Sequence, residues 1–158
     1  MNKKIVINTS PLIAFGKMKA LDSIKELPVE FVCPPQVQEE ISAGAAKGYP
    51  VSFPDWIKVT SLVNPLSPLI LANLDAGEAA VIELALQENI SDVCLDEIKG
   101  RRAAIGSGLQ VVGSLGILGQ AKTLEIVPML RPLIEKAQSA GIYYDRKLVE
   151  SFLRHYGE

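Results

Sequence analysis

The chain has 158 residues, of which 48% are hydrophobic and 22% charged, with a formal net charge of −2 at pH 7. This length suits one domain with a substantial core, and the charge excludes a protein that binds nucleic acid through bulk positive charge. An enzyme whose acidic cleft holds cations remains compatible with it. No run reaches the roughly 18 apolar residues of a membrane helix, and the start does not resemble a signal peptide, so we expect a cytoplasmic protein without membrane association.

The first predicted elements are a strand and a helical region. The apolar run KKIVIN predicts a strand covered on both faces. The segment SPLIAFGKMKALDSIKEL has helical spacing of its apolar residues, with Gly16 as the predicted break between two pieces. EFVCPP then predicts a strand and QVQEEISAG a helix, with Pro35 suited to its first turn. Residues 44–56, rich in Gly and Pro, predict a loop, and WIKVTSLV predicts a strand at a sheet edge.

The second half continues the alternation. NLDAGEAAVIELALQEN is the clearest helix, and SDVCLDE, EIKGRRAAIGSG and LQVVGS predict a strand, a helix and a strand. Helices are predicted in LGILGQAKTL, VPMLRPLIEKAQSAG and DRKLVESFLRHYG; we expect the C-terminal helices, about 127–156, to pack on the domain or extend it. The alternation predicts a mostly parallel sheet between helices, with functional groups beyond the carboxyl ends of its strands.

The two cysteines, Cys33 and Cys94, lie in apolar strand-like segments without Cys-x-x-Cys spacing. We interpret them as buried thiols in a reducing compartment. A disulfide between them is the alternative, because the sequence does not give their distance.

Oxygen-bearing side chains stand where the predicted strands end. Asn8, Thr9 and Ser10 follow the first strand, and Asp96 and Glu97 follow SDVCL. A carboxylate directly after a buried strand is costly unless it is solvated, paired or bound to a metal. Asp96 therefore has two interpretations, a site residue or the N-cap of the next helix, and one residue can fill both roles.

Two predicted helices add acids near the same edge. Glu40 lies on or beside the inward stripe of its helix, and a solvated Glu at the border of that stripe is the alternative. Glu78 lies in the first turn of a core-facing stripe. Asp75-x-x-Glu78 also matches a capping box, which explains Asp75 without any chemistry but gives Glu78 no reason to face the core.

Asn8, Glu40, Glu78 and Asp96 are thus the candidate catalytic residues. Carboxylates held close together repel one another, and a divalent cation such as Mg²⁺ or Mn²⁺ removes that penalty. The only histidine, His155, lies on a polar helix near the end, which excludes a Ser-His-Asp triad. No phosphate-binding GxxxxGK[ST] loop is present.

In their order and spacing, INTSPLI, PPQVQEEI, LDAGEAAVIELAL and SDVCLDE together resemble a PIN domain, the small metal-dependent nuclease fold of many bacterial toxin–antitoxin ribonucleases. Residues 109–158 are similar to a PIN-like branch of prokaryotic proteins described as predicted nucleic-acid-binding. The resemblance covers nearly the whole chain. It implies a single domain over residues 1–158 with a three-layer αβα fold and a central parallel sheet of about five strands.

The resemblance also implies hydrolysis of RNA phosphodiesters with Mg²⁺ or Mn²⁺. Asn8 takes the position of the family's first Asp, and Glu40, Glu78 and Asp96 take those of the second, third and fourth acids. The implied metal ligands are Asn8, Glu78, Asp96 and Glu97, and the implied substrate-binding residues are Thr9, Ser10, Lys99, Arg101 and Arg102. For the basic residues, a solvated helix face is the alternative.

One departure from the family opens alternatives. Asn8 brings no charge, so we expect a cation to be held more weakly; the alternative is a catalytically weakened or inactive PIN-like protein that binds nucleic acid. A small-molecule protein of flavodoxin-like or receiver-like topology is a second alternative, and it predicts no dependence on Glu40 and Glu78. If the toxin relation holds, we expect a short antitoxin whose apolar helix and basic residue occupy the cleft. A homodimer through the helices is also expected.

Overall fold

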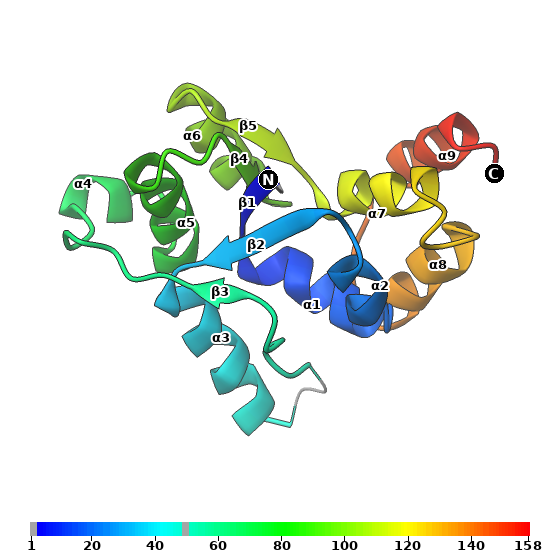
Figure 1. Ribbon diagram of the computed structural model, residues 1–158, viewed down its shortest axis with the longest axis horizontal. Helices are drawn as coiled ribbons and strands as arrows, with labels where there is room; N and C mark the ends of the chain where they lie inside the picture. Colours follow the sequence, from blue (N-terminus) through cyan, green and yellow to red (C-terminus); the bar gives the residue numbers. More distant parts are fainter. Residues whose placement is uncertain (1–2, 49–50) are drawn as a thin grey trace.

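The computed structural model describes residues 3–48 and 51–158. Its centre is a five-stranded, all-parallel sheet in the order β3-β2-β1-β4-β5 (Figure 1). The predicted α/β fold with a parallel sheet of about five strands is confirmed. The strands are β1 (Lys3–Ile7), β2 (Val29–Cys33), β3 (Lys58–Val59), β4 (Asp92–Cys94) and β5 (Gln110–Val112).

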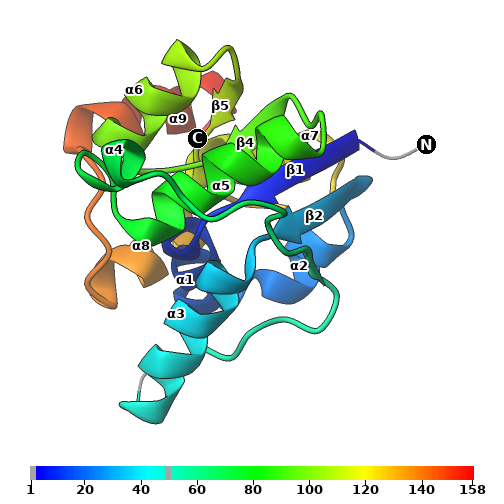
Figure 2. The same cartoon turned by 90° about the vertical axis from the view of Figure 1, so that its left-hand side faces the viewer.

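Helices flank the sheet in a three-layer arrangement (Figure 2). Helices α5 and α6 pack on each other and on the central and β5 side of the sheet, whereas α1, α2, α7 and α8 form a second connected layer. Helix α3 contacts both α1 and α5. The helices are α1 (Thr9–Lys17), α2 (Leu21–Lys25), α3 (Pro35–Ala46), α4 (Pro68–Leu71), α5 (Ala76–Gln87), α6 (Ile98–Gly106), α7 (Ser114–Thr123), α8 (Arg131–Ser139) and α9 (Arg146–His155).

The sheet order places β1 at the centre, between β2 and β4. Ile5, Val6 and Ile7 are buried, which is why this strand is a continuous apolar run rather than an alternating one. The chain proceeds from β1 outward to β2 and later returns to the other side of β1 with β4. Such a reversal opens a crevice at the carboxyl end of the central strands. The backbone N–H of Asn8 donates to the carbonyl of Cys94 at 3.1 Å, so Asn8 lies at this reversal.

The same order decides against one alternative. Flavodoxin-like and receiver-like sheets have the order 2-1-3-4-5. Because β1 here lies between β2 and β4, with β3 outside β2, the flavodoxin-like or receiver-like topology is wrong for this chain.

Two local predictions are corrected by the structure and a third is confirmed. The first helical region breaks after Lys17, where Lys19 has a φ of 57°, whereas Gly16 is helical and leaves room for Val51, which packs where a Cβ would lie. The predicted loop 44–56 starts later, since α3 runs to Ala46; residues 49–50 of that loop lie outside the described residues. The predicted edge strand WIKVTSLV is confirmed as the two-residue β3.

Helix α4 has no counterpart in the predictions. Its four residues are all apolar and none is buried, and a single turn is too short to show a helical period in the sequence. Its start is fixed instead by Ser67, whose side chain accepts a hydrogen bond from the N–H of Ile70 at 3.2 Å.

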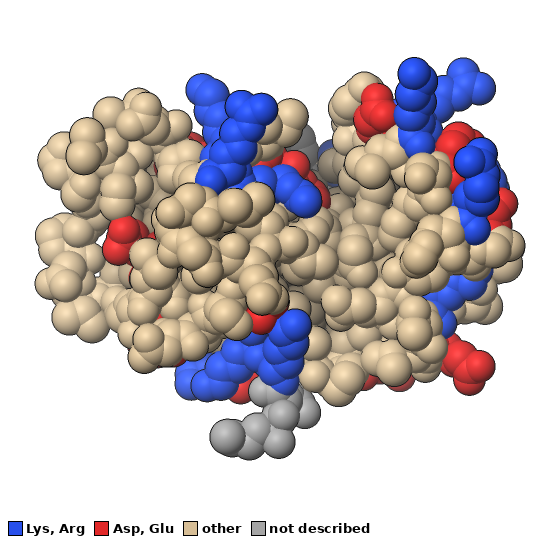
Figure 3. Space-filling view, turned by 90° about the horizontal axis from the view of Figure 1, so that it is seen from above, with Lys and Arg blue, Asp and Glu red and all other residues tan. Residues whose placement is uncertain are grey.

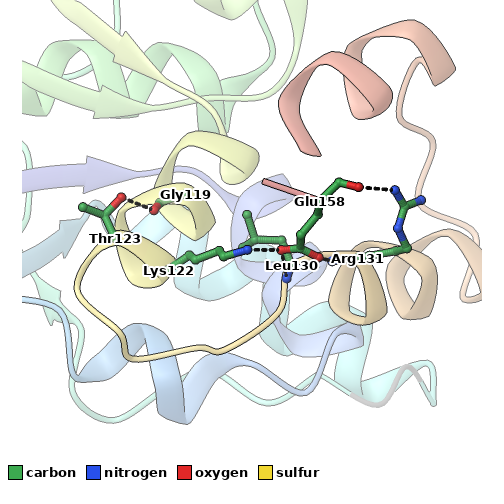
Figure 4. A network of polar contacts seen from close by, with 6 residues as sticks. All are labelled: Gly119, Lys122, Thr123, Leu130, Arg131 and Glu158. Carbon is green, nitrogen blue, oxygen red and sulfur yellow. Dashed lines mark hydrogen bonds and ion pairs between the residues drawn. The ribbon is translucent and has the colours of Figure 1, made fainter. Parts of the chain in front are cut away.

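The C-terminal helices are joined to the remainder through Glu158. Its carboxylate accepts hydrogen bonds from the N–H groups of Leu130 and Arg131 at 2.7 and 2.9 Å, and from Lys122 Nζ at 2.6 Å (Figure 4). The Glu158 side chain is only 3% exposed. Buried residues of α8 and α9, including Ile134 and Leu153, belong to the same apolar cluster as the sheet.

Both thiols are free and buried within the described ranges, as the packing interpretation of Cys33 and Cys94 predicts. Burial raises the pKa of Cys33 to about 12. Among the helices that the structure describes, none has both the length and the apolar character needed to cross a membrane.

Candidate functional site

Parallel strands bring their carboxyl ends to one edge of the sheet, and the predicted site residues follow these ends. Asn8 comes directly after β1 and Asp96 is the second residue after β4; Ser114, which was not among the predicted site residues, is the second residue after β5. Glu40 lies on α3, the helix that follows β2, and Glu78 lies in the first turn of α5, which packs on β1 and β4. Topology therefore carries all five residues to the region where functional groups gather in such sheets.

Asn8 and Thr9 form the floor of this edge. They are 4% and 7% exposed, and Asn8 is the N-cap residue of α1 by its backbone position. Among the described residues, however, Asn8 Oδ1 and Thr9 Oγ1 are buried without any hydrogen-bond partner. A buried polar atom left in this state costs about 1–3 kcal/mol. Asn8 therefore does not serve α1 through its side chain, and its oxygen is open to a donor or a cation.

Glu40 reaches this floor from α3. Most of the residue is exposed, but its carboxylate packs against the Cα of Gly77, where any Cβ would collide with Oε1. Partial burial raises the pKa of Glu40, the facing Thr9 hydroxyl opposes this, and the charge of Asp75 raises the pKa further. The carboxylate therefore lies against α5, while the residue as a whole is exposed, as the alternative of a solvated Glu at the border of the stripe predicts.

Glu78 is the most deeply buried acid of the set, at 5% exposed. Its N–H donates to Asp75 Oδ1 at 2.8 Å, and its Oε1 accepts from the N–H of Asp75 at 3.3 Å, so the predicted capping box exists and includes both acids. Burial raises the pKa of Glu78, and the negative charges of Asp75 and Glu97 add to this rise. Glu78 is therefore both a member of the capping box and a buried carboxylate whose pKa is raised by burial and by neighbouring negative charges.

Asp96 is half-buried and caps a helix other than the expected one. Its Oδ1 accepts a hydrogen bond from the N–H of Ser114 at 2.7 Å, so it serves the first residue of α7. The N-cap of α6, the next helix along the chain, is Glu97. The alternative that Asp96 caps the next helix is wrong, because β5 lies beside β4 and brings the start of α7 within reach.

The predicted substrate-binding residues separate into two groups. Lys99 and Arg102 are exposed on α6, as is Glu97 at its start, while Ser10 is half-buried in α1. Arg101 is instead folded back: its Nη1 donates to the carbonyl of Leu95 at 3.2 Å and lies with Asp96 Oδ1 beside the Cα of Gly113. For Arg101 the solvated-face alternative does not hold.

The acids form a row along the edge rather than one compact cluster. The charge of Asp75 acts on both Glu40 and Glu78, and that of Glu97 on Glu78, whereas Asp96 accepts a hydrogen bond from Ser114. Within residues 3–48 and 51–158, no three His, Cys, Asp or Glu side chains lie close enough together to hold a metal ion. The donors are two buried unpartnered oxygens and the carboxylates of Glu40 and Glu78, whose pKa burial and the charge of Asp75 raise, and these fit a hard divalent cation in chemical type. Such a cation would be held by fewer than three acids, completed by amide oxygen or water.

Sequence reasoning missed two residues at this edge. Asp75, interpreted as a cap alone, also influences the pKa of both Glu40 and Glu78. Gln36 has a buried Oε1 without a partner among the described residues, and it precedes Glu40 by four positions on α3, which places both on one helix face. The spacing of four residues between Gln36 and Glu40 was the sequence pattern that could have revealed Gln36.

A separate groove of about 330 Å³ lies between α8 and α9. None of the predicted site residues lines it. Its lining mixes both signs of charge with apolar groups: Arg131, Ile134, Glu135, Gln138, Arg146, Val149, Glu150 and Leu153.

Fold and edge together define a parallel α/β protein with a carboxylate row at the reversal of its strand order. A model of the family DUF3368, described as a PIN domain, matches residues 4–158, and the chain belongs to this PIN-domain family. The resemblance inferred from the four sequence segments is thereby confirmed. Comparisons with curated proteins and with solved structures gave no significant match.

Proposed function

We propose that this protein is a metal-dependent ribonuclease of PIN type. Membership of the PIN family supports a nuclease-like activity, and the acidic edge supports a cation-dependent one. The observation that carries the proposal is the buried, unpartnered Oδ1 of Asn8 at the reversal of the strand order. An oxygen placed there has no structural use in α1, whereas a ligand role would satisfy it.

Asn8, Glu78 and Asp96 would hold Mg²⁺ or Mn²⁺ directly, and the exposed Glu97 would be an auxiliary ligand through water. When bound, such a cation would lower the pKa of a coordinated water and so supply a hydroxide nucleophile. Glu40, whose pKa burial raises, would orient the attacking water and accept its proton from the α3 side. Thr9 and Ser10, at the start of α1, would donate to the scissile phosphate.

The exposed cations would hold the neighbouring phosphates. Lys99 and Arg102 lie on α6, the helix that starts just after Asp96 and Glu97. On the face seen in Figure 3, Lys and Arg side chains form separate groups with Asp and Glu beside them rather than one continuous basic surface. We therefore expect few phosphate contacts and modest RNA affinity with a shallow salt dependence.

The neutral Asn8 favours a second candidate, a PIN-like protein that binds nucleic acid without cleaving it. A toxin role with an antitoxin partner, a cytoplasmic location and a homodimer are further parts of the proposal, and they rest on the family relation alone.

Incubation of labelled RNA with Mn²⁺ or Mg²⁺ tests the activity. Glu78→Gln/Asp96→Asn should lower the cleavage rate on the order of 100-fold or more, because it neutralises the buried Glu78 and the half-buried Asp96. The matched control Asp22→Asn/Glu39→Gln changes two exposed acids and should leave the rate unchanged. Equal rates in wild type and Glu78→Gln/Asp96→Asn would overturn the nuclease proposal, and RNA binding without cleavage above that variant would establish the second candidate.

A further inference from the structure

Ser114 joins the acidic edge to the C-terminal part of the chain. The residue is fully buried at the start of α7. Its backbone N–H donates to Asp96 Oδ1 at 2.7 Å, and its hydroxyl shares a hydrogen bond with the Tyr144 hydroxyl at 2.7 Å. One buried serine therefore links an acid after β4 to a tyrosine in the segment between α8 and α9.

We propose that Tyr144 is a positioning residue for Asp96, acting through Ser114. The inference deepens the proposed function and rests on it, since it gives Asp96 an orientation that a ligand or catalytic role requires. The orientation of a carboxylate by its hydrogen-bond partners is a recurring feature of metal sites, and loss of such partners typically costs 10–100-fold in affinity or activity.

Geometry argues for this role over simple packing. The Ser114 hydroxyl is wholly enclosed, and Tyr144 is its hydrogen-bond partner among the described residues, so the phenol fixes the first residue of α7 from outside the sheet. That residue's N–H then fixes the carboxylate of Asp96. Arg101 restrains the same region from the other side through the Leu95 carbonyl. Hydrogen bonds from Arg101 of α6 and from Ser114 at the start of α7 thus hold the segment that carries Asp96.

The phenol is suited to a constant restraint. Burial raises the pKa of Tyr144 to about 12; the hydrogen bond with Ser114 opposes the rise, and the charges of Asp96 and Cys94 add to it. The hydroxyl therefore keeps its proton throughout the neutral range and can donate at every working pH.

Tyr144→Phe tests the inference, because it keeps the ring and removes only the hydroxyl. Tyr143→Phe is the matched control, since the neighbouring ring is 84% exposed. Two readouts are compared in the metal-free and Mn²⁺-loaded protein: the hydrogen-exchange rate of the Ser114 amide, and RNA cleavage resolved into kcat and KM. Exchange at Leu84, in the buried part of α5, reports general loosening of the fold.

We expect Tyr144→Phe to accelerate exchange at Ser114 about fivefold while Leu84 is unchanged, since one hydrogen bond is lost locally. We expect kcat to fall on the order of tenfold with KM nearly constant, and Tyr143→Phe to match wild type in every readout. Ser114→Ala combined with Tyr144→Phe should lower kcat little more than either alone, because both act through one contact.

Failure of the positioning role and failure of the proposed function give different results. Unchanged exchange at Ser114, or equal acceleration at Ser114 and Leu84, overturns the positioning role whether or not RNA is cleaved. Selective acceleration at Ser114 in a protein that cleaves no RNA supports the positioning role and counts against the proposed function alone. Selective acceleration with unchanged kcat in a cleaving protein also overturns the role.

Discussion

Glycines shape the acidic edge residue by residue. Glu40 packs on Gly77, Glu78 on Gly100, and both Asp96 and Arg101 on Gly113. A Cβ at Gly100 would lie 2.9 Å from Glu78 Oε2, and one at Gly113 would lie 3.0 Å from Asp96 Oδ1. Each charged group thus occupies the space that a side chain would fill, so these glycines serve close approach rather than an unusual backbone conformation.

Gly77→Ala should abolish most of the activity without destabilising the protein. Alanine favours a helix over glycine by about 1 kcal/mol, but its Cβ would displace the Glu40 carboxylate. Gly106→Ala on α6 is the control, because nothing lies within 4 Å of its Cβ position. We expect both variants to keep or raise the Tm while only Gly77→Ala loses cleavage. Full cleavage by Gly77→Ala would mean that the position of Glu40 is not needed.

Asn8→Asp should tighten the binding of Mn²⁺ at least tenfold, or about 1.4 kcal/mol, since a carboxylate replaces a neutral amide oxygen beside the other acids. The metal-free variant should also be less stable than wild type, because the new charge is buried. Mn²⁺ titration followed by electron paramagnetic resonance measures the affinity, with the exposed Asn64→Asp as control. An affinity equal to that of the Asn64→Asp control would place Asn8 outside the cation site.

Residues of the edge could be predicted from the sequence where an apolar strand pattern or a helical stripe placed them. Asn8 and Asp96 followed apolar strands, and Glu78 lay on a core-facing stripe; the structure buries Asn8 and Glu78 accordingly. What Asp96 contacts was beyond reach, because its partner Ser114 is 18 positions away and depends on β5 lying beside β4. The proposed role of Tyr144 depends on its contact with Ser114, 30 positions away in the sequence, and no local sequence pattern indicates such a contact.

At the scale of elements, Glu158 organises the ends of α7 and α8. It satisfies two N–H groups at the start of α8 and the ammonium of Lys122 in α7. Burial alone would raise the pKa of Glu158, but Lys122 and the N–H groups of Arg131 and Leu130 outweigh it and lower the pKa below its usual value. The ionised carboxylate is therefore the form that stabilises this junction.

Glu158→Gln should lower the free energy of unfolding by roughly 2 kcal/mol at pH 7, the scale of hydrogen bonds to a charged group. Because the pKa is lowered in the folded state, the contribution is complete above the usual glutamate pKa and disappears as the pH falls through the folded value. Wild type and variant should thus converge in acid. Urea unfolding between pH 7 and pH 3 measures this difference.

Glu150→Gln is the matched control for Glu158→Gln. Its ion pair with Arg131 is longer, at 3.8 Å, and half-exposed, so its loss should change stability by less than about 1 kcal/mol. If the two variants lose the same stability, or if the effect of Glu158→Gln persists in acid, the ionised junction is not what stabilises the C-terminal helices.

Elements were predictable in proportion to the apolar surface that they bury. Helix α5, with eight buried residues, was evident from its stripe, whereas α4 buries none and went unseen. Strand β3 was placed correctly at the edge but is shorter than its sequence pattern, because only Lys58 and Val59 pair with β2. Tertiary pairing, not propensity, sets its length.

At the scale of the whole molecule, one apolar cluster extends from Ile5 in β1 to Leu153 in α9. We predict that residues 1–158 unfold in a single cooperative transition. Leu153→Ala should then destabilise the entire chain by roughly 2–5 kcal/mol, shifting far-ultraviolet circular dichroism and Trp56 fluorescence together. The exposed Leu148→Ala on the same helix should have little effect. Two separate transitions would show that the C-terminal helices form their own unit.

The central claim is that Asn8 and the acids of the carboxyl edge share a divalent cation. The most direct measurement is an anomalous difference map from a crystal grown with Mn²⁺. We predict a peak at the carboxyl ends of β1 and β4, with Asn8 Oδ1 and a Glu78 oxygen near coordination distance, about 2.1 Å for a hard cation such as Mg²⁺. A map in which this edge stays empty while Mn²⁺ binds exposed acids elsewhere would contradict the account.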